Sequence, residues 1–334
     1  MTRPTLATPS GEQYARILSI GSYRPERVVH NDELVEAIES SDQWIRERSG
    51  IVSRRFAAPD ESVTDMAEAA SRVAIERAGL TPPDIDMVLV ATVTHPYQTP
   101  SSASLLAHRL GSTPAAALDV SPACAGFSYG IAMASDMIRG GSARNVLVVG
   151  VEKLSDFLDL NDRSTAFIFG DGAGAVVVGP SRTLAIGPTV WGSDGSQWDA
   201  IVNKSSWIEY RDRGTEWPAL KMAGQSVFRW AVWQMAPVAQ KALDAAGVTA
   251  ADLAAFIPHQ ANVRIIDAMA KQMGLPAHVA VARDIVDAGN TSAASIPLAM
   301  DRLLESGEVR SGGLALLIGF GAGLTYAAQV VELP

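Results

Sequence analysis

The sequence contains a single cysteine, Cys124, in 334 residues. One cysteine cannot form an intrachain disulfide, and it excludes the cysteine-rich patterns that bind structural zinc. Basic residues are few, with 27 Lys and Arg against 36 Asp and Glu. The resulting net charge of −9 argues against general electrostatic binding of nucleic acid. No uninterrupted apolar run approaches the roughly 18 residues of a membrane span. These absences predict a soluble protein of a reducing, cytoplasmic compartment, with no nucleic-acid or membrane partner.

The remaining composition suits an α/β enzyme. Hydrophobic residues make up 48% of the chain and aromatic residues only 6%, while 28 glycines allow many tight turns. The length is sufficient for about two domain-sized units. Residues 1–16 are rich in Pro, Thr, Ser and Gly and have no apolar core. We therefore predict a flexible N-terminal tail there, rather than a signal peptide.

The chain contains two copies of one pattern. Residues 78–84 (AGLTPPD) and 246–252 (AGVTAAD) share four of seven positions and are separated by about half the chain length. Each copy follows an Ala-rich helical segment and precedes a short apolar run that is typical of a buried strand. A second pair of apolar runs, at 144–150 and 313–319, has nearly the same separation. Several matches in the same order indicate a duplicated scaffold.

The two copies differ by an insertion. Both contain a GxGAG motif, at 170–174 and 319–323, but these motifs lie closer together than the other matched pairs. We therefore predict related halves at 17–183 and 184–334, with an inserted segment at 151–169 in the first half, where function is often added. Both glycine motifs precede strands rather than opening helices, which disfavours a dinucleotide site.

Cys124 lies at a predicted strand-to-helix turn. It follows the apolar residues 115–120 and precedes a helical pattern at 131–139. A helix N-terminus presents unpaired N–H groups and positive dipole, which would lower the pKa of the thiol and favour the nucleophilic thiolate. The same N–H groups would suit an oxyanion hole. The alternative is a small buried cysteine that packs as a hydrophobe, which composition alone favours.

Two polar residues of the second half lie in comparable positions. Asn290 follows Cys124 by about half the chain length, at a similar turn, and we interpret it as the counterpart of Cys124. His259 directly follows the second half's apolar strand and precedes a helix. Groups at strand ends of one scaffold can converge on one pocket. Together the three residues supply a nucleophile, a base and an amide donor, which predicts thioester or acyl chemistry.

At these residues the sequence resembles the β-ketoacyl-acyl carrier protein synthase III family, the initiating condensing enzymes of type II fatty-acid synthesis. The resemblance covers residues 17–333. It rests on the motifs SDQWI (41–45), RSGI (48–51), ACAG (123–126), FGDGAG (169–174), PHQAN (258–262), GNTSAA (289–294) and GFGAG (319–323). The implied architecture is the thiolase-like α/β fold, with two duplicated βαβαβαββ halves in a five-layer αβαβα arrangement, assembled as a homodimer.

The resemblance implies a role for each of the three polar residues. Cys124 would take the acyl group from acyl-coenzyme A (acyl-CoA). His259 and Asn290 would bind the thioester carbonyl of malonyl-acyl carrier protein and stabilise the enolate left by decarboxylation, which would attack the acyl group on Cys124. The backbone N–H groups of Cys124 and Ala322 would form the oxyanion hole, although relatives commonly have glycine at the Ala322 position. No separate cofactor or metal is implied, because acyl-CoA is a substrate.

The resemblance also implies the CoA contacts. Trp44 would stack on the adenine, with Arg163 on its other face and Arg48 near the phosphates. Guanidinium and indole faces can enclose a base while the charge meets phosphate. Asn262 and Gln225 would contact the pantetheine arm, although many relatives have Asn where this chain has Gln225.

Two further predictions concern the carrier protein and the primer. Arg229, Arg264 and Lys271 would form a local basic patch for an acidic carrier protein, with a solvated helix face as the competing explanation. Thr99 occupies a position where several bacterial relatives have a Phe from the dimer partner that closes the acyl pocket. A small side chain there predicts tolerance of longer or branched primers.

Other protein classes fit the residues less well. A biosynthetic thiolase needs a second catalytic cysteine, and elongating ketosynthases use two histidines. Plant-type polyketide synthases share Cys, His and Asn, but the HQAN and GNTSAAS contexts favour the initiating enzyme, and the papain cysteine signature is absent. Two alternatives stay open. One is a secondary-metabolism relative that primes a polyketide or transfers an acyl group to a small molecule, and the other is a noncatalytic scaffold in an acyl-carrier complex.

Overall fold

The structure, a computed structural model, describes residues 6–334 and is built on two five-stranded sheets. The first sheet has the strand order β1-β7-β6-β4-β5. Its strands are β1 (Tyr14–Tyr23), β4 (Met87–Ala91), β5 (Ala116–Val120), β6 (Val146–Glu152) and β7 (Gly172–Ser181), and the helices between them are α2 (Val63–Arg77), α3 (Ser102–Leu110) and α4 (Gly126–Gly140). Strand β4 runs parallel to β5 and β6, whereas β7 is antiparallel to β6 and β1.

The second sheet repeats this order. It runs β12-β11-β13-β14-β8, with β11 parallel to β12 and β13, and β14 antiparallel to β13 and β8. Its strands are β8 (Val190–Ser193), β11 (Ala255–Pro258), β12 (Ala280–Val281), β13 (Leu314–Gly321) and β14 (Thr325–Glu332), and its helices are α6 (Gly224–Ala246), α7 (Val263–Gln272), α8 (Ile285–Ala288) and α9 (Ser295–Glu305). Each half therefore has the βαβαβαββ order that the resemblance implies.

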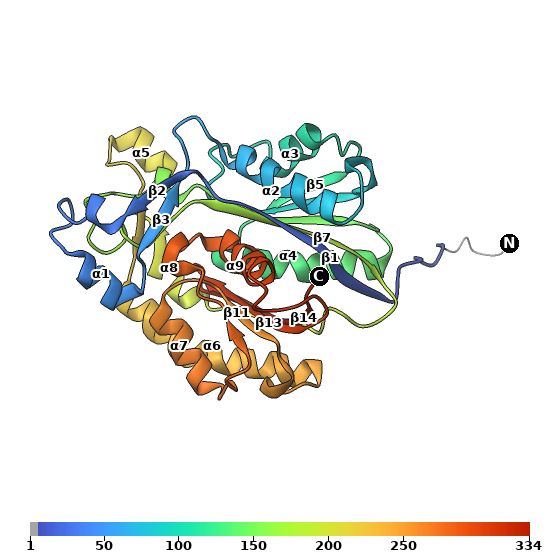
Figure 1. The fold of residues 1–334 in the computed structure, drawn as a ribbon. Helices are drawn as coiled ribbons and strands as arrows, with labels where there is room; N and C mark the ends of the chain where they lie inside the picture. The colour runs from blue at the N-terminus through green and yellow to red at the C-terminus, as the bar shows by residue number, and fades with distance from the viewer. Residues whose placement is uncertain (1–5) are drawn as a thin grey trace.

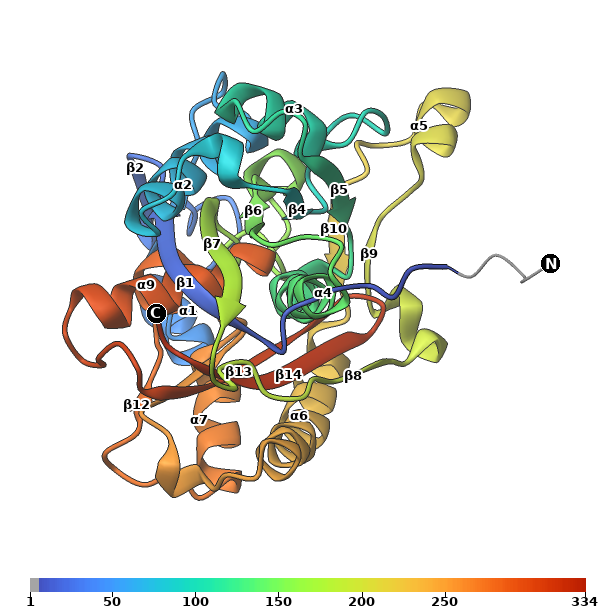
Figure 2. The same cartoon turned by 90° about the vertical axis from the view of Figure 1, so that its right-hand side faces the viewer.

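The helices and sheets form five layers (Figure 1). Helices α2 and α3 pack on the outer face of the first sheet, and α6 and α7 pack on the outer face of the second. Helices α4 and α9 lie between the sheets, where Phe127 and Ile296 join strands of both halves in one core. Figure 2 shows α4 end-on between the two sheets. Strands buried on both faces explain the continuous apolar runs of the sequence.

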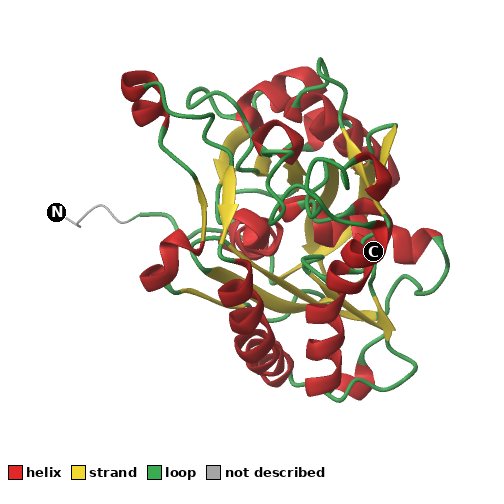
Figure 3. Cartoon of the chain, turned by 90° about the vertical axis from the view of Figure 1, so that its left-hand side faces the viewer, coloured by secondary structure: helices red, strands yellow, loops and turns green. Residues whose placement is uncertain are grey.

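Three segments outside the repeat gather at one end of the molecule (Figures 1 and 3). The first segment contains β2 (Arg27–His30), α1 (Asp42–Ser49) and β3 (Ser53–Phe56), and the second contains β9 (Ile201–Asn203), α5 (Trp207–Arg213) and β10 (Leu220–Met222). The third, between β6 and β7, is the inserted segment. It covers residues 153–171, because β6 continues to Glu152 and β7 begins at Gly172. The predicted bounds of 151–169 are therefore shifted by two residues.

The predicted N-terminal tail is too long. Strand β1 already begins at Tyr14, Ala15 is buried, and the Glu12 N–H donates to the Ile138 carbonyl. Residues 1–5 lie outside the described residues. At the start of β1, partly exposed residues alternate with buried ones, which is the pattern of a strand. The segment follows directly on the residues rich in Pro and Thr, so its composition does not distinguish it from the tail.

Within residues 6–334, none of the helices combines the length and the apolar character that crossing a bilayer requires.

Candidate active site

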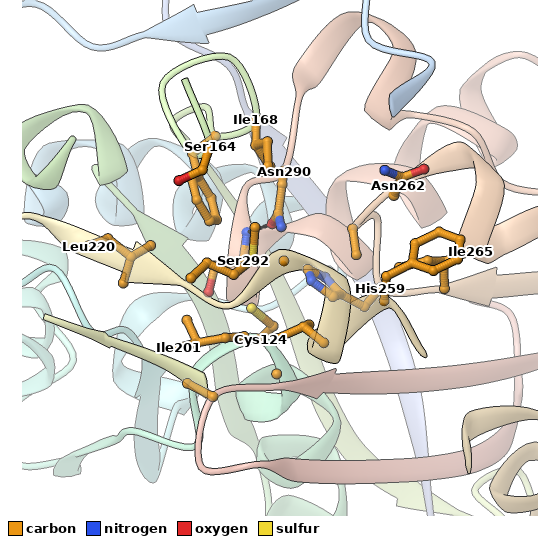
Figure 4. Close-up of a pocket in the computed structure, with 18 of the residues that line it drawn as sticks. Cys124, Ser164, Ile168, Ile201, Leu220, His259, Asn262, Ile265, Asn290 and Ser292 are labelled. Atoms are coloured by element: carbon orange, nitrogen blue, oxygen red, sulfur yellow. Dashed lines mark hydrogen bonds between the residues drawn. The ribbon is translucent and has the colours of Figure 1, made fainter. Parts of the chain in front are cut away.

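One cavity of about 860 Å³ opens at the end of the molecule where the added segments lie (Figure 4). It brings together most of the residues predicted from the sequence, namely Trp44, Arg48, Cys124, Arg163, Gln225, Arg229, His259, Asn262, Arg264, Asn290 and Ala322. Two predicted residues do not line it in the single chain. Thr99 is exposed beyond β4, and Lys271 is exposed in the last turn of α7.

Cys124 lies at the bottom of this cavity, in a single turn of 3-10 helix that leads into α4. The turn packs directly on the GxGAG motif of the second half. A Cβ at Gly319 would lie 2.8 Å from the Cα of Ala125, and a Cβ at Gly321 would lie 2.9 Å from the Cys124 sulfur. Contacts this short do not occur between real atoms, so both positions require glycine. The motif therefore serves close packing against the cysteine and not phosphate binding.

The counterpart of Cys124 in the second half is Ala293 and not Asn290. The turn Ala123–Ala125 corresponds to Ser292–Ala294, which leads into α9 in the same way. Both turns begin with a left-handed residue, Ala123 at φ 46° and Ser292 at φ 48°. This equivalence keeps the spacing of the repeated strands, so the pairing of Cys124 with Asn290 was a misalignment. Asn290 still reaches the cavity, because it lies two residues before the turn.

The thiol of Cys124 has a raised pKa, contrary to the prediction from the helix N-terminus. Cys124 keeps some exposed surface toward the cavity, but the protein surrounds its sulfur closely. Burial raises the pKa to about 12, and the negative charge of nearby Glu152 raises it as well. The neighbouring Ser292 hydroxyl and the N–H of Cys124 itself lower the pKa in part. The resting protein therefore holds a neutral thiol.

His259 is placed by the end of β11 and is buried. Its backbone N–H donates to the Ile318 carbonyl, and its Nδ1 lies 2.8 Å from the Ser295 hydroxyl. The Ser295 oxygen already accepts the Gln260 N–H, so its own proton is available for Nδ1. The imidazole proton then sits on Nε2. Burial lowers the His259 pKa to about 3, so the ring is a neutral hydrogen-bond donor and a poor base.

Asn290 is fixed by its own loop and by the inserted segment. Its side-chain oxygen accepts the Ser292 N–H at 2.8 Å, which leaves the amide NH₂ as the free end of the side chain. The Asn290 backbone bonds Ile168 and Gly170 through its N–H and carbonyl. The insertion therefore helps to hold a residue of the opposite half at the cavity.

The mouth of the cavity carries an indole between two guanidinium groups. The Arg163 guanidinium carbon lies 4.9 Å from the centre of the Trp44 ring, and that of Arg48 lies 5.5 Å away. Phe167 packs edge-on against the same ring. Asn262 donates to the Arg48 carbonyl and caps α7. Aromatic and cationic groups in this arrangement suit a flat base attached to phosphates.

Exposed cations continue from the mouth across α6 and α7. Arg229 lies on α6. Arg264 lies in the first turn of α7, with its guanidinium carbon 5.1 Å from the centre of the Phe228 ring. Lys271 lies two helical turns beyond Arg264. These three groups are exposed, as a docking surface for an acidic partner requires.

Several residues near the cysteine were not predicted. They are Glu152 at the end of β6, Ser292 and Ser295 beside the catalytic candidates, Phe320 against His259, and the β9–β10 residues Ile201, Leu220 and Met222. The sequence contains one usable signal, since Glu152 ends an otherwise apolar buried strand. The short strands β9 and β10 are separated in the sequence by α5. With three residues each, they are too short to show the hydrophobic alternation that predicts a strand.

Comparisons with known proteins agree with this geometry. Models of the families described as 3-oxoacyl-[acyl-carrier-protein] synthase III and its C-terminal part match residues 118–195 and 243–333. The chain is 59% identical over 325 residues to the β-ketoacyl-[acyl-carrier-protein] synthase III of Streptomyces glaucescens, covering 97% of this chain and 98% of that one. It is 54% identical over 330 residues to the mycobacterial β-ketoacyl-[acyl-carrier-protein] synthase III of Mycobacterium avium, covering 98% of each.

Solved structures show the same fold. The priming β-ketosynthase of a polyketide biosynthetic pathway superposes with a TM-score of 0.97 at 50% identity, over 99% of each chain. The 3-oxoacyl-(acyl carrier protein) synthase III of Pseudomonas aeruginosa superposes with a TM-score of 0.89 at 40% identity, over 96% of this chain and 99% of that one.

Proposed function

Because the chain belongs to the β-ketoacyl-acyl carrier protein synthase III family of condensing acyltransferases, we propose that it joins an acyl-CoA primer to malonyl-acyl carrier protein. The product is a 3-oxoacyl-acyl carrier protein, which initiates fatty-acid synthesis. The observation that carries this proposal is the meeting of Cys124, His259 and Asn290 in one cavity whose mouth holds the Trp44 ring between two guanidinium groups.

In the first half-reaction the Cys124 sulfur attacks the thioester carbon of acyl-CoA. A thioester forms on Cys124, and CoA leaves as the free thiol. The N–H groups of Cys124 and Ala322 stabilise the oxyanion that develops on the carbonyl oxygen. The close approach of the 319–323 turn to the cysteine supports this pairing of donors. The acyl chain extends past Ile201 and Leu220, which present apolar surface near the sulfur (Figure 4).

In the second half-reaction malonyl-acyl carrier protein replaces CoA in the cavity. The His259 Nε2–H and the Asn290 amide NH₂ donate to its thioester carbonyl oxygen. Two donors aimed at this oxygen stabilise the enolate that forms as the C–C bond breaks and CO₂ leaves. The enolate carbon then attacks the acyl thioester, and Cys124 leaves as a thiolate that takes one proton from water. A neutral His259 suits this role, because it donates without needing to ionise.

The remaining contacts follow from the same assignment. Adenine stacks on Trp44 between Arg163 and Arg48, and Asn262 and Gln225 border the pantetheine arm. We assign the surface of Arg229, Arg264 and Lys271 to the acidic carrier protein. No separate cofactor or metal takes part, since CoA arrives with the primer. A homodimer and a cytoplasmic location belong to the same proposal.

The test separates the two half-reactions. Radiolabelled acyl-CoA should label the protein, and the label should be lost in Cys124→Ala. His259→Ala and Asn290→Ala should retain labelling but lose decarboxylation of malonyl-acyl carrier protein. Equal loss of both steps in these variants would contradict the division of roles. An unlabelled wild-type protein would instead favour a noncatalytic scaffold.

A second function differs only in pathway. The likeness to a solved priming β-ketosynthase of polyketide biosynthesis favours a role in priming a polyketide. Turnover with acetyl-, isobutyryl- and long-chain acyl-CoA, each offered with fatty-acid and polyketide carrier proteins, distinguishes the two. Thr99 predicts turnover of the longer and branched primers, and Thr99→Phe should reduce it. Strict acetyl specificity of the wild type would contradict the prediction. Labelling without condensed product would indicate acyl transfer to a small molecule.

A further inference from the structure

Glu152 is a fully buried carboxyl group that the proposed function does not use. It ends β6, directly beneath the turn that contains Ser292. Its Oε2 accepts hydrogen bonds from the Thr94 hydroxyl at 2.7 Å, the Thr92 hydroxyl at 3.1 Å and the Val93 N–H at 3.1 Å. Its Oε1 accepts the Ser292 hydroxyl at 3.1 Å. These donors hold the carboxyl group in one orientation, with one oxygen facing the active site.

Ser292 connects this carboxyl group to the nucleophile. Its hydroxyl donates its one proton to Glu152 Oε1, and its oxygen lies close enough to the Cys124 sulfur to lower the pKa of the thiol. Figure 4 shows the Ser292 and Cys124 side chains together at the bottom of the cavity. The Ser292 backbone is held at φ 48°, with its N–H on the Asn290 oxygen. Such a conformation is uncommon outside glycine, and the surrounding bonds over-determine it.

Acylation needs an acceptor for the thiol proton. Cys124 enters the reaction as a neutral thiol because burial raises its pKa. His259 is a poor acceptor, since burial lowers its pKa to about 3. Glu152 has a pKa raised by burial to about 7, which matches a base that works near neutral pH. Glu152 is therefore better suited than His259 to accept the thiol proton.

We propose that Glu152 accepts the Cys124 proton through the Ser292 hydroxyl during acylation, a positioning and proton-relay role that rests on the proposed function. The S–H proton moves to the Ser292 oxygen while the Ser292 proton moves to Glu152 Oε1. The thiolate then bonds the acyl carbon and the bond from that carbon to the CoA sulfur breaks. The proton returns through Ser292 to the departing CoA sulfur, and Glu152 is ionised again.

Charge balance supports this path. An ionised Glu152 opposes a thiolate at Cys124, because two buried negative charges repel each other. Transfer of the proton between them leaves a single negative charge in the buried region throughout. Lys153 adjoins Glu152 in sequence, but its ammonium group turns away to the Ala58 and Pro59 carbonyls and toward Asp156. Lys153 therefore does not neutralise a second negative charge near Cys124.

Two serines three residues apart provide a matched pair of variants. Ser292→Ala removes the relay hydroxyl but keeps the N–H that holds Asn290, and Ala123 already adopts the same left-handed conformation. Ser295→Ala removes the hydroxyl that orients His259. CoA release from acyl-CoA alone measures acylation by rapid quench. Decarboxylation of labelled malonyl-acyl carrier protein by pre-acylated enzyme measures the second step.

We expect Ser292→Ala to slow acylation by about 100-fold and to change decarboxylation by less than about twofold. Ser295→Ala should show the opposite split. Glu152→Gln should also slow acylation, and the rise of the acylation rate with pH near 7 should disappear, while Glu152→Asp should restore part of both. Circular dichroism and thermal melting identify variants that fail to fold. In that case Ser292→Gly replaces Ser292→Ala, because glycine adopts the left-handed conformation freely, and it should slow acylation to the same extent.

The proposal is overturned if Ser292→Ala and Glu152→Gln acylate at wild-type rates with an unchanged pH profile. It is equally overturned if both variants lose the two steps in parallel, since that result indicates a structural role. Failure of the proposed function has a different signature. In that case Cys124→Ala would keep the acyl label, or the wild type would take up none.

Discussion

The side-chain oxygen of Asn290 accepts the backbone N–H of Ser292 at 2.8 Å. This bond fixes which end of the amide is the oxygen, so the NH₂ group remains as a donor for the substrate carbonyl. The same short loop thus sets the orientation of Asn290 and, through the Ser292 hydroxyl, the surroundings of Cys124. Both half-reactions depend on the left-handed conformation at Ser292.

Asn290→Asp tests the donor role. The new carboxylate can still accept the Ser292 N–H, but it presents an acceptor and a negative charge where a donor is required. Condensation should fall by roughly 10²- to 10³-fold, as for the loss of one oxyanion-stabilising donor. Acyl labelling of Cys124 should persist. Asn203→Asp adds the same charge at another position of the cavity, and a comparable loss there would show that charge alone accounts for the effect.

Gly321→Ala tests the close packing of the glycine motif. The added Cβ would lie 2.8 Å from the Cys124 Cβ and 2.9 Å from its sulfur, so the turn or the cysteine must move. Because a shift of about 1 Å in a reacting group can cost 10²-fold in rate, acylation should fall by about that factor. Gly140→Ala, where a Cβ meets nothing within 4 Å, serves as the control. Normal acylation by Gly321→Ala would show that the motif tolerates a side chain.

Arg163→Ala tests the mouth of the cavity. Loss of one guanidinium from the Trp44 ring should raise KM for acyl-CoA about tenfold, equivalent to a cation–π contribution of about 1 to 2 kcal/mol. The rate with a short acyl-pantetheine thioester, which has no adenine, should not change. Steady-state kinetics with both substrates measure the difference. Arg139→Ala, at an exposed position on α4, removes the same charge as a control. If Arg163→Ala impaired the reaction equally with both substrates, Arg163 would not act through the adenine.

Much of the fold could be predicted because it follows from repetition. Strands buried on both faces give continuous apolar runs, and the duplication separates the matching runs of the two sheets by about half the chain length. The meeting of Cys124 and His259 follows from the same symmetry. The counterpart of Cys124 did not, because Asn290 also lies about half the chain length away at a similar turn. The left-handed backbone at Ala123 and Ser292 shows the correct equivalence.

The properties of the site were harder to predict than its location. The helix-terminus argument considered local dipoles only, and the thiol pKa is instead dominated by burial among residues distant in sequence. His259 likewise becomes a donor through burial and through Ser295, which lies 36 residues away. Spacing along the chain identifies which groups converge, but their ionisation depends on how many atoms surround them after folding.

Glu152 should make the stability of the protein depend on pH. Its pKa is raised from 4.5 to about 7 in the folded state, so the folded protein holds a proton that the unfolded chain releases between these values. Stability therefore falls as pH rises through this window, by about 3 kcal/mol for a shift of this size. Asp171, with its pKa raised to about 6, contributes with the same sign, whereas His259, with its pKa lowered, contributes with the opposite sign.

Comparison with Glu152→Gln isolates the contribution of this residue. The variant retains Asp171 and His259, so their effects cancel in the difference between the two proteins. Urea unfolding at pH 5 and pH 8 should show wild type losing about 2.5 kcal/mol relative to Glu152→Gln as the pH rises. A difference that does not change with pH would mean that Glu152 is ionised throughout. The Glu152 carboxylate would then have an ordinary pKa, and it would be a weaker acceptor for the Cys124 proton than the relay requires.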